Sequence, residues 1–525
     1  MTITKCITLP CLLLFVFLAS CSFPAATRGA PTVVPSTSPS PSPLPSTSTS
    51  TPFLPDPVSP TPSLTPTPTA TPTETATPTP TATPTPPPSL NTRYALTVEL
   101  NYTSHYLDVS EVITYTNRTT EAMNELMLVV EANRQSWVFS LQEMTWADGG
   151  VVEGYKLDKH RLRVPLREVL IPGGKVVIQL SYSLQLPAIP EDNPNAKPVV
   201  FGYSARQTNL VDWYPYVAAY RAGEGWLVYD PWFFGETLVY EMGDYEVMLV
   251  RVDGGADVVI AASAPAEADG LGYRYHMRSA RTFVFSMAVD YQVAEAEVGD
   301  VKVYSYHFPW STEAGEAVLE DTVKALTLYE ELFGPYPYAS LSAVEADFLD
   351  GMEYGGLYFL SRGFYNGFYD DNRPRMKEWL RAIAVHETGH QWWYGLVGNN
   401  QALEPWLDEA LCTYMERLYY ERYYPDLLSD WWAFRINEIA PVGWVGDAVS
   451  EYKGYSAYRN AVYLRGAQFL EALRQRVGDE AFFAFLKDYA TRMAGKIATS
   501  EDFFSILKEH TTEDINDLLA EYFRP

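Results

Sequence analysis

The clearest chemical pattern in this 525-residue chain is His386-Glu387-Thr388-Gly389-His390. The surrounding periodicity predicts a helix over about 376–396. Residues four apart lie on one face of a helix, so both imidazoles can hold one Zn²⁺ at about 2.1 Å. Glu387 lies beside them, where its carboxylate can reach a metal-bound water without binding the ion. The alternative is a surface helix with two unrelated histidines.

A catalytic zinc needs a third protein ligand and a fourth position left for water. Glu409 follows His390 with eighteen residues between them and lies on the next predicted helix, 403–422. A helical hairpin can bring it under the first helix. Zinc held in this way lowers the pKa of its water towards about 7 and polarises a scissile carbonyl. We expect Glu387 to take the proton from that water and pass it to the leaving amine.

The spacing of apolar residues changes along the chain, in the segments that must position these side chains. From Tyr94 onward apolar residues recur at every second position, and again over 176–184 and 245–249, which predicts half-buried strands. We therefore expect an antiparallel β domain over 92–296. Residues 297–525 are mainly helical in pattern, with predicted helices over 312–332, 376–396, 403–422, 457–476, 479–490 and 501–523.

The N-terminal residues have the pattern of a targeting signal and are not expected to belong to the fold. Residues 1–21 predict an export signal, because an apolar run too short to span a bilayer precedes Leu18-Ala19-Ser20-Cys21. That tetrapeptide resembles a bacterial lipobox, which implies lipidation of Cys21; an ordinary secretory signal is the alternative. Residues 22–91 are rich in Pro, Thr and Ser and predict a disordered stalk. We therefore expect an exported protein with a lipid anchor at the bacterial cell envelope.

Charge and cysteine content narrow the possible partners. The net charge of −27 argues against nucleic acid, since a surface that follows phosphates must be basic. Three of the four cysteines lie in the leader, so the body holds only Cys412, which we expect to be a small buried hydrophobe. No internal disulfide is then possible in the body. The sequence does not predict an oligomeric state.

Beyond the histidine pair, three segments make the chain similar to peptidase family M1 of the gluzincin clan. The combination of His386, His390 and Glu409 resembles the signature of that clan. The further segments are Phe333-Gly334-Pro335-Tyr336-Pro337-Tyr338, Gly351-Met352-Glu353-Tyr354, which resembles Gly-x-Met-Glu-Asn, and Tyr463-Leu464-Arg465-Gly466-Ala467, which resembles Tyr-x-Lys-Gly. The resemblance covers 92–525. It implies an N-terminal β domain of saddle or sandwich type, followed by an α+β, thermolysin-like zinc peptidase domain.

The resemblance also implies roles for single residues. Tyr463 would donate its phenol proton to the developing oxyanion, with Tyr458 in support. Glu353 would bind the free α-amine of a peptide by a charge-assisted hydrogen bond, which makes an aminopeptidase. Gly351 and Met352 would let the substrate backbone approach an edge strand or loop. Gln207 would be a second amine-binding group from the β domain.

Tyr354 replaces the Asn of the family motif, and this change removes no metal ligand. Two other functions stay open. The chain can be an endopeptidase of the same clan, in which Glu353 serves another purpose. It can also be a surface-displayed binding protein with a structural zinc, although such sites normally close with four protein ligands.

Overall fold

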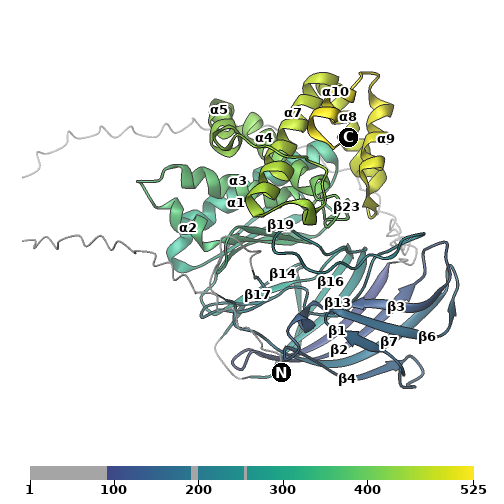
Figure 1. Cartoon of the computed structure of the whole chain (residues 1–525). Coiled ribbons are helices and arrows are strands. Elements are labelled where there is room, and N and C mark those ends of the chain that lie inside the picture. The colour runs from purple at the N-terminus through teal and green to yellow at the C-terminus, as the bar shows by residue number, and fades with distance from the viewer. Residues whose placement is uncertain (1–90, 191–198, 254–256, 525) are drawn as a thin grey trace, which may run out of the picture. The chain divides into compact units, whose positions relative to one another are not determined.

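The computed structural model describes residues 91–190, 199–253 and 257–524 (Figure 1). The expected export signal, Cys21 and all of the expected stalk except its last residue lie outside the described residues. None of the helices in these ranges combines the length and the apolar composition that crossing a membrane requires.

Strands dominate the first part of the described chain, as predicted. A seven-stranded sheet has the order β15-β16-β13-β1-β2-β7-β4 and a four-stranded sheet the order β10-β3-β6-β5. In β1 buried residues alternate with more exposed ones, because successive side chains point to opposite faces. The strands of the first sheet are β1 (Thr92–Asn101), β2 (Tyr106–Thr116), β4 (Phe139–Trp146), β7 (Lys175–Gln185), β13 (Gly243–Arg251), β15 (Ala266–Asp269) and β16 (Gly272–Ala280). Those of the second are β3 (Met123–Val129), β5 (Lys156–Asp158), β6 (Arg161–Leu170) and β10 (Tyr216–Val217).

One strand pair departs from the antiparallel arrangement that we expected for this domain. Strands β1 and β13 pair in parallel, with Thr92 opposite Gly243 and Leu100 opposite Arg251. A parallel pair needs a long crossover, and the intervening strands supply it. Two smaller sheets, β14-β17-β9-β8 and β11-β12, complete the domain. Their strands are β8 (Gly202–Tyr203), β9 (Thr208–Leu210), β11 (Tyr220–Arg221), β12 (Gly225–Trp226), β14 (Val259–Ala262) and β17 (Phe285–Ala288).

A five-stranded mixed sheet, β18-β19-β20-β22-β21, begins the second part. Strand β18 (Gln292–Val298) runs across the boundary at 296/297 expected from the sequence, and β21 (Gly351–Tyr354) forms the far edge. The other strands are β19 (Val301–His307), β20 (Ser340–Ala346) and β22 (Leu357–Ser361), and a separate short pair joins β23 (Gly398–Asn399) to β24 (Ile497–Ala498). A β-rich domain followed by a helix-and-sheet domain confirms the predicted fold class.

The α-helices follow the predicted segments, with corrections at three of them. They are α1 (Thr312–Phe333), α2 (Arg362–Phe368), α3 (Arg375–Gly389), α4 (Trp406–Tyr423), α5 (Leu428–Trp431), α6 (Tyr455–Arg459), α7 (Gly466–Val477), α8 (Asp479–Met493), α9 (Ser500–His510) and α10 (Asn516–Tyr522). The helix expected to reach 396 ends at Gly389, because the chain then turns tightly through Tyr394, whose φ is +116°. The segment expected as one helix over 501–523 is divided into α9 and α10.

Short helical turns of other types connect these elements. The 3-10 turns are Glu131–Arg134, Pro309–Ser311, Pro425–Leu427, Asn437–Ile439 and Val449–Glu451. Two π-helical turns, Trp432–Ile436 and Asn460–Arg465, follow α5 and α6. The second interrupts the helix predicted over 457–476.

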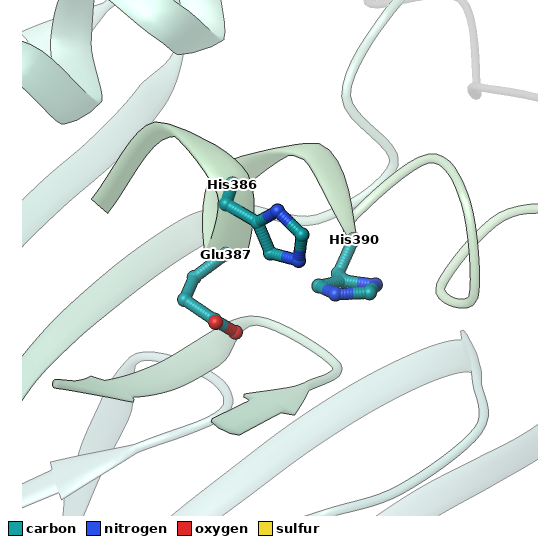
Figure 2. A group of neighbouring side chains, drawn as sticks. All are labelled: His386, Glu387 and His390. Carbon is teal, nitrogen blue, oxygen red and sulfur yellow. The ribbon is translucent and has the colours of Figure 1, made fainter. Parts of the chain in front are cut away.

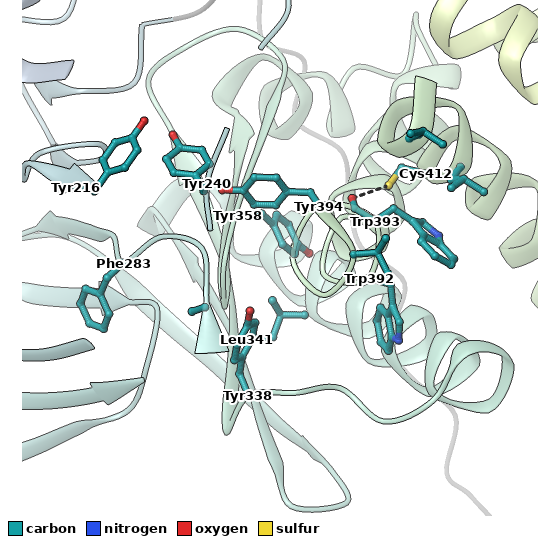
Figure 3. Packing of buried hydrophobic residues seen from close by; sticks show 14 of the residues in the cluster. Tyr216, Tyr240, Phe283, Tyr338, Leu341, Tyr358, Trp392, Trp393, Tyr394 and Cys412 are labelled. Atoms are coloured by element: carbon teal, nitrogen blue, oxygen red, sulfur yellow. Dashed lines mark hydrogen bonds between the residues drawn. The ribbon is translucent and has the colours of Figure 1, made fainter. Parts of the chain in front are cut away.

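Aromatic residues fill the core between the β domain and the helices (Figure 3). Trp392 and Trp393 are fully buried below α3, which agrees with the core role that their pattern indicates. Cys412 is buried and its thiol faces the carbonyl of Trp393, as expected for a small hydrophobe. The buried guanidinium of Arg281, in the β domain, donates to the carbonyls of Tyr394 and Lys496 and so joins the two parts.

Candidate metal centre and cleft

Helices α3 and α4 bring three potential metal ligands together. Oε2 of Glu409 lies 3.2 Å from Nε2 of His386 and 3.5 Å from Nε2 of His390. Donors about 2.1 Å from a tetrahedral zinc are separated by about 3.4 Å, so these distances fit one ion. Figure 2 shows both imidazoles on one side of α3 with Glu387 beside them. Two imidazoles and one carboxylate leave the fourth position open, as in catalytic zinc sites.

Hydrogen bonds on the far side of each imidazole orient it. Nδ1 of His386 lies 2.9 Å from a carboxylate oxygen of Glu416, which can only accept, so Nδ1 carries the proton. Nδ1 of His390 donates to the carbonyl of Trp393 over 3.1 Å. Both bonds leave Nε2 to face the metal position.

Glu416 is itself held by a buried network that the sequence reasoning missed. Nε and Nη2 of Arg435 each donate to one of its oxygens over 2.8 Å, and the indole of Trp431 donates over 3.1 Å. Glu416 follows Glu409 by seven residues on α4, which places both on one helix face. That seven-residue spacing was the signal in the sequence from which Glu416 could have been found.

Burial and hydrogen bonds act in opposite directions on the pKa values of His386 and Glu409, which with His390 form the donor cluster. Burial lowers the pKa of His386, but hydrogen bonds to Glu409 and Glu416 outweigh this effect and raise it to about 9. Burial acts to raise the pKa of Glu409, yet the bonds from both histidines hold it well below its ordinary value. Burial raises the pKa of Glu387, whose Oε2 has no hydrogen-bond partner among the described residues. A proton acceptor of raised pKa beside an open ligand position suits general-base work.

A cavity of about 410 Å³ opens over this cluster. Strand β21 forms one wall, and Glu353 faces the cavity from it together with Gly351 and Met352. A Cβ on Gly351 would lie 2.1 Å from Oε1 of Glu387, so only glycine allows this close approach of strand and helix. Glu353 is buried and accepts a hydrogen bond of 3.2 Å from Gln401, a residue that the sequence reasoning also missed.

The two tyrosines singled out by the family pattern lie together at the same cavity. The hydroxyl of Tyr463 donates to Glu409, and its ring stacks on His386 with centroids 5.9 Å apart. Tyr458 and Tyr463 are five residues apart, and the π-helical turn Asn460–Arg465 brings their rings to 5.7 Å. An uninterrupted α-helix would turn them away from each other, since it repeats every 3.6 residues.

Gln207 does not belong to this site, which corrects the sequence-based assignment. Its amide group is buried in a separate network and donates to Ser286, Tyr291 and the carbonyl of Glu345. Its Oε1 accepts from the backbone N–H of Asp347 over 3.0 Å. Both ends of the amide are thus occupied within the structure. From the β domain, Phe234, Gly235 and Glu236 line the cavity, and the sequence predicted none of them.

Comparison with known proteins agrees with this arrangement. Residues 317–522 match the model of the peptidase family M1 domain. Aminopeptidase M1-D of Oryza sativa subsp. japonica is 30% identical over 233 residues, and aminopeptidase N of Lactobacillus delbrueckii subsp. lactis is 26% identical over 216. These alignments cover 42% and 38% of this chain but only 26% and 25% of the relatives, so the chain matches about a quarter of their length.

Solved structures extend the similarity to both domains. The M1 zinc metallopeptidase of Deinococcus radiodurans aligns with a TM-score of 0.60 at 18% identity, over 83% of this chain and 94% of that one. A mutant of it bound to a Tyr-Ser-Ala substrate aligns with a TM-score of 0.57. The fold is thus similar to that of these metallopeptidase structures. The family match at 317–522 contains all three potential metal ligands, so this part of the chain is similar to the peptidase family M1 domain.

Proposed function

We propose that this chain is a zinc-dependent aminopeptidase. One observation carries the exopeptidase assignment: Glu353 lines the same cavity as the donor cluster, on the edge strand that passes Glu387. A fixed carboxylate at that place binds the ammonium of a substrate whose scissile bond lies over the metal position. A longer chain has no free amine there, which disfavours internal cleavage.

The residues divide the hydrolysis among them. His386, His390 and Glu409 would hold zinc, which would polarise the scissile carbonyl and make a bound water more acidic. Glu387 accepts the proton of the attacking water and hands it to the departing amine. Tyr463 donates a hydrogen bond to the oxygen that gains negative charge, and Tyr458 supports its ring. Gly351 and Met352 present backbone to the substrate along β21.

Chromogenic aminoacyl substrates test the assignment, each with a free and an N-acetylated amine. We expect hydrolysis of the free-amine forms only, lost with chelator and in Glu387→Gln. Glu353→Gln removes one charge from the amine contact and should lower kcat/KM at least about 10-fold, since hydrogen bonds between charged groups are the stronger class. Glu438→Gln, an exposed position outside the cavity, is the matched control.

Equal cleavage of acetylated and free substrates would instead identify an endopeptidase. A zinc-loaded protein that hydrolyses neither form would be the binding protein with a structural metal. Intact activity in Glu353→Gln, with the free-amine preference kept, would remove the observation on which the exopeptidase assignment rests.

We also propose, from the sequence alone, that the protein is exported and anchored through a lipid on Cys21. Radiolabelled fatty acid should enter the full chain in a bacterial host and not its Cys21→Ala variant. Equal labelling of both would contradict the anchor. Secretion of an unlabelled chain would support an ordinary export signal.

A further inference from the structure

The cavity continues along α3 well beyond the metal position. Its lining includes Met376, Trp379 and Ile383, which precede His386 on α3. From Met376 to His390 the helix advances about 21 Å, at about 1.5 Å per residue. The cavity is therefore longer than one amino-acid residue needs.

The direction of β21 identifies the end of the cavity that would receive the leaving part of a substrate. Glu353 lies near the end of the strand, Gly351 packs on Glu387, and Asp350 precedes the strand. A strand rises about 3.3 Å per residue, so Asp350 and Glu353 are about 10 Å apart. With the amine at Glu353 and the scissile bond above Glu387, the leaving residues extend past Asp350 towards Trp379.

Helix α6 closes this far end. The hydroxyl of Tyr455 donates to Oδ2 of Asp350 over 2.9 Å, which links the start of α6 to the start of β21 across the cavity. Arg459 is four residues further along α6 and so shares the face of Tyr455. It lies between Tyr455 at the far end and Tyr463 at the metal position, and it lines the cavity.

Among the described residues, Arg459 has no carboxylate partner to balance its charge. Two arginines line the cavity, and Arg435 is already paired with both oxygens of Glu416. The side chain of Arg459 donates only to the neutral amide oxygen of Asn460, at 3.1 and 3.4 Å. In the described part of the chain no carboxylate lies within 4.0 Å of it. A half-buried guanidinium that faces a cavity is suited to binding a carboxylate or phosphate.

We infer that Arg459 is a specificity residue that binds a carboxylate on the leaving side of the substrate, so that short peptides with a free C-terminus are preferred. The inference rests on the proposed function for its direction along the cavity. The cavity then carries a negative charge at Glu353 for the amine and a positive charge at Arg459 for the carboxylate. The same chemistry is offered by an acidic side chain at the second residue, so the test must separate these two sources.

Four substrates that share leucine as the N-terminal residue provide the test: Leu-Ala, Leu-Ala-amide, Leu-Asp-amide and leucine p-nitroanilide. We expect the wild type to favour Leu-Ala over Leu-Ala-amide at least about 10-fold in kcat/KM, since bonds to charged groups are the stronger class. Arg459→Gln should abolish that preference and leave the anilide rate unchanged. Arg459→Lys should keep part of it. The control Arg492→Gln removes one exposed charge on α8 and should change nothing.

Binding provides a second measurement that does not require turnover. Calorimetry on zinc-loaded Glu387→Gln should show tighter binding of Leu-Ala than of its amide, and the Arg459→Gln double variant should bind both alike. The wild type can also bind Leu-Asp-amide more tightly than Leu-Ala-amide. If Arg459→Gln loses that preference, Arg459 binds an acidic side chain as well. Equal affinities of the free acid and the amide would overturn the inference. An inactive wild type that still discriminates in binding would refute the proposed function and not this contact.

Discussion

At the scale of residues, Glu416 shows how much of a metal site lies outside its ligands. Its carboxylate accepts from His386 and is held by Arg435 and Trp431, so the imidazole is fixed with Nε2 towards the metal position. We expect Glu416→Gln to weaken zinc binding about 10- to 100-fold, as losses of such orienting partners do. Competition with a chromogenic zinc chelator measures the affinity.

The control for this change is Glu421→Gln, further along α4 and outside the donor cluster. If Glu416→Gln bound zinc as tightly as the wild type, the orienting role of the Glu416 network would be wrong. A loss that also appeared in the control would point to the stability of α4 instead.

At the scale of elements, β2 places an acid inside the β domain. Glu111 is fully buried, and burial raises its pKa well above the ordinary value, with only partial relief from the Tyr182 hydroxyl. In the native state it keeps its proton at a pH where the unfolded chain has lost it. Unfolding therefore releases a proton, and stability falls as the pH rises above about 4.5, by about 1.4 kcal/mol per pH unit until the native pKa is reached.

Glu111→Gln removes this titration. The variant should be more stable than the wild type at pH 7, and its free energy of unfolding should depend less on pH. Urea unfolding between pH 4.5 and 8 measures both. The exposed Glu143→Gln on β4 provides the comparison. Parallel pH curves for wild type and Glu111→Gln would show that Glu111 ionises normally in the folded protein.

At the scale of the whole molecule, the metal position joins α3 to α4 within the second domain. A ligand that binds only the folded state stabilises it by an amount that grows with its concentration, about 4 kcal/mol at a thousand times Kd. We therefore expect chelation to lower the melting temperature and added zinc to restore it. Calorimetric scans with zinc, chelator and chelator followed by zinc test this expectation.

The same scans on a His390→Ala variant, which lacks one ligand, should show little dependence on zinc. A wild-type melting temperature that did not respond to chelator would mean that zinc contributes nothing to the stability of the folded domain. Arg281 joins the β domain to the carbonyls of Tyr394 and Lys496 in the second domain. The zinc-dependent shift in melting temperature should therefore involve both described domains together.

The sequence alone determined the features that depend on local spacing. Histidines four apart on a predicted helix, a downstream glutamate and the alternation of apolar residues each predict an outcome that neighbours along the chain impose. The predicted β-then-peptidase order is confirmed for this reason. Helix ends were predicted less well, because the end of α3 depends on the turn through Tyr394.

Only the tertiary structure decided which distant residues share a site. The family resemblance implies a place for Gln207 in the cleft, but its amide group is bound in a separate buried network. Glu236, Gln401 and Arg459 line or support the cavity through packing that local periodicity does not encode. Whether a polar group is available to a ligand depends on its partners in space. Periodicity reports only the neighbours along the chain, so that availability appears only in the folded protein.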